Sequence, residues 1–122
     1  MKPKDIRKGA FDYSLRAIKL YQFLREGKDG AGQIIGKQFL RSATSIGANL
    51  EGAQAGESKK DFIHKCAIAQ KENREALYRL KLLAASGIVP EKRTDPLLQE
   101  TEELYAVITA IIVNAKKRRK QG

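Results

Sequence analysis

The residues that come closest to a reaction centre are Asp61 and His64, three positions apart in the stretch DFIH. Helix bundles often hold two metal ions between glutamates and a pair of Glu-x-x-His motifs. Such a site needs two histidines, and His64 is the only one in the chain. At about 100° per residue on a helix, both side chains also point away from the apolar row that contains Cys66. We therefore expect a solvated helix start, a surface histidine and no metal.

Two further stretches carry only part of what catalysis or phosphate binding requires. Cys66 is the single cysteine; it lies on a predicted core row, and His64 lies on another helix face, so a packed thiol is expected. Residues 31–38 (AGQIIGKQ) lack the first glycine and the hydroxyl residue of the phosphate-binding motif G-x-x-x-x-G-K-[ST], and no strand precedes them. A loop that leads into a helix is the expected structure. The sequence predicts neither an enzyme nor a bound cofactor.

The strongest functional signal is the run of bases at residues 116–120. The net charge is +10, of which this run supplies +5 and residues 1–8 supply +3, so the body between them is nearly neutral. Basic ends favour an anionic partner, nucleic acid first. Two interpretations stay open: contacts with the phosphates of RNA or DNA, or a solvated helix end whose cations complement the helix dipole. No aromatic residue is interleaved for base stacking. The candidate contacts are Lys116, Lys117, Arg118, Arg119 and Lys120.

Length and composition limit what can carry these residues. A chain of 122 residues, 42% hydrophobic and 31% charged, fits one globular domain over residues 1–122, with a short basic N-terminal segment and a basic tail at 116–122. The charged start resembles no secretory signal, and the longest apolar stretch, residues 110–113, is too short to span a bilayer. One cysteine fits a reducing compartment. We expect a cytoplasmic protein with no membrane contact.

Four segments have the apolar period of a helix, and turn signals separate them. The first runs from about Asp12 to Arg25 and the second from about Gln33 to Gln54. Ser58 is placed to cap the third, which Gly87 ends. Asp95 and Pro96 are placed to open the last as its N-cap and first helical residue. No useful strand alternation is present, and short loops join the segments. The sequence predicts an all-α, up-down antiparallel four-helix bundle.

The predicted core rows contain one polar residue that needs an explanation. Asn73 interrupts the row of the third helix, where an unpaired amide would cost about 1–3 kcal/mol. It either fixes the register of the helices, as asparagines do in coiled coils, or joins a hydrogen-bond network with Asn49 and with Glu72 or Glu75. The two rows consist of Gly36, Phe39, Ala43, Ile46, Leu50 and Ala53, and of Phe62, Cys66, Ala69, Asn73, Ala76, Leu80 and Leu83.

Self-association is predicted from the first and last helical segments. Their apolar residues cover arcs wider than one core requires, and exposed apolar patches usually mark an interface. In the first segment one arc consists of Phe11, Leu15 and Ile18, next to a second arc that contains Leu20 and Leu24.

The middle of the chain resembles a known family. The stretches 40–49 (LRSATSIGAN), 58–63 (SKKDFI), 68–75 (IAQKENRE) and 78–83 (YRLKLL) are similar to the four-helix bundle proteins, also called 23S rRNA intervening-sequence proteins. The resemblance covers roughly residues 11–115 and leaves out the basic tail. Two positions depart from the family pattern: Gly52 replaces a common glutamate, and Arg79 replaces a typical aromatic residue, so no role is carried over to either.

The resemblance implies a fold and a setting. Members are small cytosolic bacterial proteins, many encoded within insertions in large-subunit ribosomal RNA genes, and no catalytic residues are known for them. They are similar to accessory proteins of diversity-generating retroelements, which form pentameric rings and act with a reverse transcriptase and nucleic acid. The expected function is therefore a non-enzymatic homo-oligomer that binds RNA or DNA, and the resemblance suggests five copies. The alternative is a protein-interaction scaffold whose tail aids solubility or contacts an acidic partner.

Overall fold

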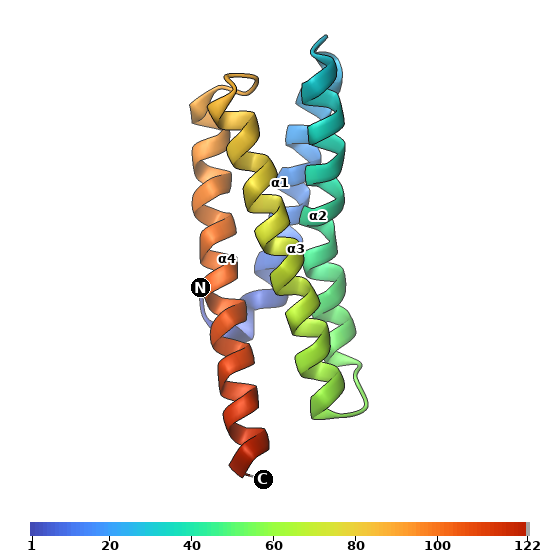
Figure 1. Ribbon diagram of the computed structural model, residues 1–122, viewed down its shortest axis with the longest axis vertical. Coiled ribbons are helices and arrows are strands. Elements are labelled where there is room, and N and C mark those ends of the chain that lie inside the picture. The colour runs from blue at the N-terminus through green and yellow to red at the C-terminus, as the bar shows by residue number, and fades with distance from the viewer. Residues whose placement is uncertain (122) are drawn as a thin grey trace.

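Four long helices make up the fold in the computed structural model, which describes the backbone of residues 1–121 and the side chains of residues 1–118. A single 3₁₀ turn, η1 (Pro3–Asp5), leads into α1 (Ile6–Glu26), and α2 (Gly30–Gln54), α3 (Lys59–Ala85) and α4 (Glu91–Gln121) follow. Each helix packs against the next, and α4 closes the bundle against α1 (Figure 1). No strand occurs among residues 1–121. The predicted up-down four-helix bundle is confirmed.

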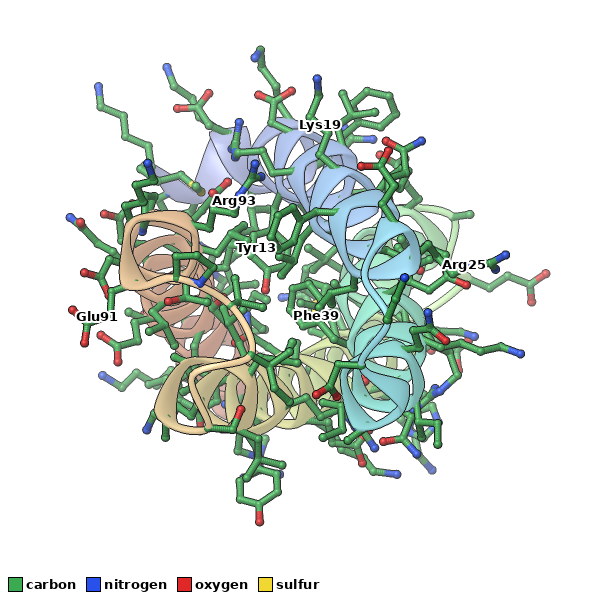
Figure 2. The ribbon with its side chains drawn as sticks, turned by 90° about the horizontal axis from the view of Figure 1, so that it is seen from above. Tyr13, Lys19, Arg25, Phe39, Glu91 and Arg93 are labelled. Atoms are coloured by element: carbon green, nitrogen blue, oxygen red, sulfur yellow. The ribbon has the colours of Figure 1, made fainter. Side chains whose placement is uncertain are left out.

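The core lies along the central axis, where side chains from all four helices meet. Figure 2 shows Tyr13 of α1 and Phe39 of α2 pointing into this centre. Their rings meet edge to face, with centroids 6.4 Å apart and an interplanar angle of 74°. Both side chains are fully buried, as are Leu80 of α3 and Leu104 of α4. Burying a side chain of this size contributes roughly 1.5–3 kcal/mol, so this layer is a main source of stability.

The predicted ends of α3 are confirmed. Ser58 Oγ accepts a hydrogen bond from the Asp61 backbone N–H at 3.1 Å, which satisfies one of the free donors in the first turn. Gly87 follows the helix with φ 78°, a left-handed conformation that glycine adopts without steric cost. The predicted core rows of α2 and α3 are also buried, apart from Phe62, which is half-buried.

Three helices begin earlier than predicted, and α1 and α2 are the simpler cases. α1 starts at Ile6 rather than Asp12, because Ile6 and Ala10 are buried and extend its core row by more than one turn. α2 starts at Gly30, inside the glycine-rich segment that was predicted to be a loop. Asp29 makes this possible: its Oδ1 accepts from the Gly32 N–H at 2.8 Å and caps the helix.

The predicted start of α4 is wrong. The helix begins at Glu91, so Pro96 lies within it rather than in its first position. The Pro90 carbonyl accepts from the N–H groups of Arg93 and Thr94 and so starts the helix. Thr94 is fully buried, and its packing favours the extra turn. Pro96 has no N–H to donate to the Lys92 carbonyl. Lys92 is exposed and is the second residue of the helix, so water can reach this carbonyl and the missing hydrogen bond costs least there.

None of the helices described for residues 1–121 is both long and apolar enough to cross a lipid bilayer.

Candidate nucleic-acid interface

The two basic ends of the chain lie in the half of the bundle where α1 begins and α4 ends (Figure 1). Four antiparallel helices return the chain to the end where it began, and η1 packs against both α1 and α4. In Figure 1, α4 continues past the connection between α2 and α3, so its last turns project from the bundle. By sequence, residues 1–8 and 116–120 carry eight of the ten net positive charges. The topology therefore places most of the positive charge in one half of the bundle, with the N-terminus beside the middle of α4 and the tail beyond the end of the bundle.

The basic tail continues α4 beyond the core. Ile112 is the last buried residue of the helix that the structure describes, and Ala115 is half-buried. Lys116, Lys117 and Arg118 are exposed, and none has a carboxylate within 4.0 Å among the side chains of residues 1–118. The other two predicted contacts, Arg119 and Lys120, have side chains outside the described residues.

The N-terminal bases divide into paired and unpaired groups. Lys8 Nζ donates to Asp12 Oδ2 at 2.8 Å, and this hydrogen bond raises the pKa of Lys8 and lowers that of Asp12. Arg7 lies 3.4 Å from Glu51 Oε2 on α2. Lys2 and Lys4 are exposed and have no such partner among the described side chains. Exposed pairs of this kind contribute little to stability, so all four bases remain accessible to an anionic partner.

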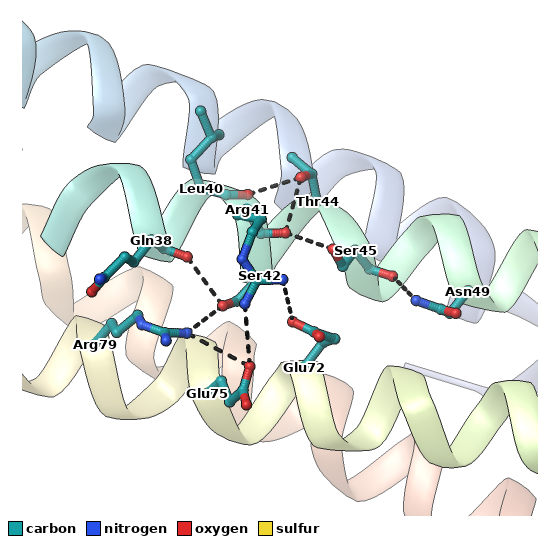
Figure 3. A network of polar contacts seen from close by, with 10 residues as sticks. All are labelled: Gln38, Leu40, Arg41, Ser42, Thr44, Ser45, Asn49, Glu72, Glu75 and Arg79. Carbon is teal, nitrogen blue, oxygen red and sulfur yellow. Dashed lines mark hydrogen bonds and ion pairs between the residues drawn. The ribbon is translucent and has the colours of Figure 1, made fainter. Parts of the chain in front are cut away.

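A second group of charged residues joins α2 to α3 (Figure 3). Arg41 lies 3.5 Å from Glu72 Oε2 and 3.4 Å from Glu75 Oε2. Arg79 lies 3.7 Å from the same oxygen of Glu75 and donates to Ser42 Oγ at 2.6 Å. Glu72 Oε2 has no hydrogen bond within the described structure, so the Arg41 charge is what offsets its burial. Glu72 and Glu75, both predicted members of a network, meet here around two arginines.

The two predicted asparagines make no direct hydrogen bond to these glutamates, and Asn49 reaches the group in Figure 3 only through Ser45 of its own helix. Asn49 donates from Nδ2 to the Ser45 carbonyl of its own helix at 2.8 Å. Asn73 faces α4: with its amide turned so that both ends meet a suitable partner, Nδ2 donates to the Thr101 carbonyl at 3.1 Å and Oδ1 accepts from the Tyr105 N–H at 3.2 Å. The side chain therefore inserts beside one backbone hydrogen bond of α4 and fixes the register of α3 against it. The structure thus brings together two of the four predicted residues.

A buried polar contact at the centre of the bundle was not anticipated. Thr101 donates its hydroxyl hydrogen to the Leu97 carbonyl at 2.6 Å. Tyr13, whose hydroxyl lies 2.7 Å from Thr101 Oγ1, must therefore be the donor in that bond. Burial raises the pKa of Tyr13, and the Thr101 hydrogen bond opposes the shift only in part. The signal in the sequence was the row Ile6, Ala10, Tyr13, Ala17, spaced 4, 3, 4, which places Tyr13 on the core face.

The residues considered for catalysis or metal binding do not form a centre. Cys66 is 1% exposed, and burial raises the pKa of its thiol, which disfavours the reactive thiolate. His64 is exposed. Within residues 1–118, no three histidine, cysteine, aspartate or glutamate side chains are grouped to hold a metal ion. Residues 31–38 belong to α2 and form no loop that could cradle phosphate.

The apolar arcs of the first and last helices differ in their surroundings. On α1, Phe11, Leu15 and Ile18 are 63%, 47% and 38% exposed. On α4 nearly all of the wide arc is buried or half-buried against α1 and α3, and Val113 is the large apolar residue that stays exposed. Only α1 therefore presents a row of unpaired apolar side chains, next to a groove of about 330 Å³ between α1 and α2.

Comparisons with known proteins agree with this architecture. The model of a family described as 23S rRNA-intervening sequence protein matches residues 3–110. A crystal structure of a protein of unknown function from the S23 ribosomal protein family of Bacteroides thetaiotaomicron superimposes with a TM-score of 0.80. The two chains are 31% identical over 88% of this chain and 97% of the other. No curated protein matches.

Proposed function

The chain belongs to the 23S rRNA-intervening sequence protein family, and we propose that it is a non-enzymatic, self-associating module that binds the backbone of RNA or DNA through its basic end. The observation that carries the proposal is that both basic segments lie in the half of the bundle where α1 begins and α4 ends, with the tail projecting beyond it (Figure 1). The exposed bases of the last turns of α4 are the proposed phosphate contacts, and the exposed Lys2 and Lys4 of the N-terminal segment are further candidates.

The run of consecutive bases favours a nucleic-acid backbone over other anions, because the backbone carries negative charges at a similarly close spacing. Nucleic acids present closely spaced phosphates and a condensed layer of counterions, and each base that neutralises a phosphate releases counterions. A helix that projects from a bundle with several unpaired bases can approach such a backbone without displacing any core contact. Contacts of this kind position a protein on nucleic acid and do not read its sequence, so we expect binding that is largely indifferent to base composition.

Self-association would multiply these contacts. The exposed row Phe11, Leu15 and Ile18 is the proposed contact between copies, and the family resemblance suggests five copies in a closed ring with heterologous contacts. Each copy would present its basic end in the same direction, because a ring relates all copies by rotation about one axis. Several weak phosphate contacts then act together through avidity. Cytoplasmic location is part of this proposal, since RNA and DNA are found there.

The test is removal of residues 116–122, followed by binding of RNA and DNA across a series of salt concentrations. The full chain should lose affinity with salt at a log–log slope of roughly −0.9 per contact for duplex DNA and about −0.7 for single strands. The truncated chain should keep its fold, because the described core ends before residue 116, and should bind more weakly with a flatter slope. A truncated chain with unchanged affinity and slope would contradict the proposal.

A protein-interaction scaffold is the alternative, and the exposed apolar row of α1 is the observation that favours it. In that case the row binds a different protein, and the basic tail adds solubility or contacts an acidic partner. The alternative predicts a monomer in light scattering and no salt-dependent retention on nucleic acid. The proposed function predicts the opposite result in both measurements.

A further inference from the structure

We propose that the outward face of α3 is a binding site for single-stranded nucleic acid, in which a base stacks on Tyr78 while Lys71 and Arg74 contact the flanking phosphates. The inference rests on the proposed function and gives it a second location, apart from the tail. It also supplies the aromatic surface that the tail lacks.

The three side chains form one continuous surface. Lys71, Arg74 and Tyr78 are spaced i, i+3 and i+7, which places them on one face of α3 across two turns. They line a shallow pocket of about 380 Å³. Tyr78 is 65% exposed, and its hydroxyl makes no hydrogen bond to the residues that the structure describes. A large aromatic ring left open beside two cations is suited to a ligand that combines a flat ring with negative charge.

The pocket is positive because its one carboxylate is already engaged. Glu75 lies 3.4 Å from Arg41 and 3.7 Å from Arg79, so its charge is offset within the network of Figure 3. Lys71 and Arg74 have no carboxylate within 4.0 Å among the described side chains. Both therefore remain available to an anion, and the network holds the neighbouring arginines in place.

The positive surface continues along α3 in both directions. Lys60 and His64 lie three and two turns before Lys71 on the same stripe, and Lys81 lies two turns after Arg74. All are exposed, and Glu75, the acidic residue four positions after Lys71 on this side of the helix, is paired with Arg41 and Arg79. From Lys60 to Lys81 the helix rises by about 30 Å, enough for an extended strand to follow it with several phosphates in reach.

Single strands fit this surface better than a duplex does. In a duplex the faces of the bases are covered by their neighbours, so none is free to stack on Tyr78. A single strand can turn a base outward, and stacking on an aromatic side chain tolerates any base because each has a π-face. RNA and DNA share this chemistry, and the test below includes both.

The experiment measures fluorescence anisotropy of labelled oligo(U), oligo(dT) and an oligo(dA)·oligo(dT) duplex with the full chain and its variants. Tyr78→Ala should weaken single-strand binding roughly 5- to 140-fold, which is the cost of about 1–3 kcal/mol per stacked base at 1.4 kcal/mol per tenfold. Duplex binding should change much less, and Tyr78→Phe should retain single-strand affinity. Lys71→Gln with Arg74→Gln should flatten the salt slope for single strands by about 1.4, at roughly 0.7 for each lost contact.

Matched controls lie on other faces. Ile34→Ala removes a side chain of α2 that is 64% exposed, nearly the same fraction as Tyr78. Lys19→Gln with Lys92→Gln removes two exposed charges from α1 and α4; Figure 2 shows Lys19 on the side of the bundle away from α3. These controls should leave single-strand affinity within about twofold, a change well below one stacking contact. Light scattering is recorded for every variant.

Four results would overturn the inference. If the full chain binds and the tail truncation weakens it, while the α3 variants behave like their controls, the α3 site is wrong and the proposed function stands. If Tyr78→Ala weakens duplex and single strands equally, the ring does not stack on a base. If Tyr78→Ala changes the oligomeric state, the surface is a contact between copies. If the full chain binds none of the three probes, the proposed function fails together with the site.

Discussion

Two glycines of α2 that look alike in sequence should respond in opposite ways to alanine. In both helical positions alanine gains about 1 kcal/mol, because glycine loses more backbone freedom on folding. A Cβ on Gly47 would lie 3.5 Å from Ala10 Cβ on α1, an ordinary van der Waals contact. A Cβ on Gly36 would lie 2.6 Å from Leu24 Cδ1, which must move within a buried site. Overpacking of this kind costs typically about 1–3 kcal/mol.

Gly47→Ala should therefore stabilise the bundle by up to about 1 kcal/mol and raise its Tm by roughly 3–5 °C for a chain of this size. Gly36→Ala should be neutral at best and should destabilise the bundle by up to about 2 kcal/mol. The cost of the clash with Leu24, about 1–3 kcal/mol, equals or exceeds the gain of about 1 kcal/mol from reduced backbone freedom. Urea unfolding followed by circular dichroism, at one fixed protein concentration, measures both against the wild type. Equal stabilisation by the two substitutions would refute the reasoning, because it would mean that Leu24 does not fill the space beside Gly36.

Three further predictions concern the surface and the core. Phe11→Asp or Leu15→Asp should reduce the apparent mass in light scattering, whereas Ile34→Asp, on another face, should not; equal effects would place the contact between copies elsewhere. Burial raises the pKa of Tyr13, so the folded state holds the phenol proton more tightly than the unfolded state does. The stabilising contribution of Tyr13 should be complete below about pH 10 and fall above it, and the difference in unfolding free energy between wild type and Tyr13→Phe should shrink accordingly; a pH-independent difference would contradict this. Cys66 should react with a thiol reagent at neutral pH only as fast as the protein opens, and immediate reaction of the folded protein would show that the thiol is not packed.

The buried face of a helix could be predicted from the sequence where a single row of apolar residues defines it. In α2 and α3 the spacing of buried residues and the Ser58 and Gly87 signals determine both the core face and the ends of α3. The starts of α1, α2 and α4 were missed because tertiary contacts outweigh local signals. Thr94 is buried by its neighbours, and this outweighs the preference of Pro96 for the first turn.

The polar contacts were less predictable than the helices, because sequence spacing gives the face of a residue and not its partner. Asn73 was correctly placed on the core side, yet which helix it meets depends on how α3 and α4 are rotated against each other. Glu72 and Glu75 were predicted members of a network, whereas their partners were not predicted: Arg41 pairs with both glutamates, and Arg79 pairs with Glu75. Arg79 stands where the family resemblance suggests an aromatic residue, and here its donation to Ser42 gives that position a polar role.

The location of the positive charge follows from the number of helices. An up-down bundle with an even number of helices ends in the half of the bundle where its first helix began, so two basic termini with a neutral body between them lie in the same half. With an odd number, the same sequence of charges would be split between opposite ends. α3 also begins in this half of the bundle, because the connection from the end of α2 leads directly into it. Its first two residues are Lys59 and Lys60. The stripe on α3 therefore starts beside the basic end, on the helix next to α4, and the two proposed sites lie on one path that a single strand could follow. Because the path crosses from α4 to α3, tail truncation and Tyr78→Ala in one chain should weaken single-strand binding by more than either change alone, whereas duplex binding should respond mainly to the tail.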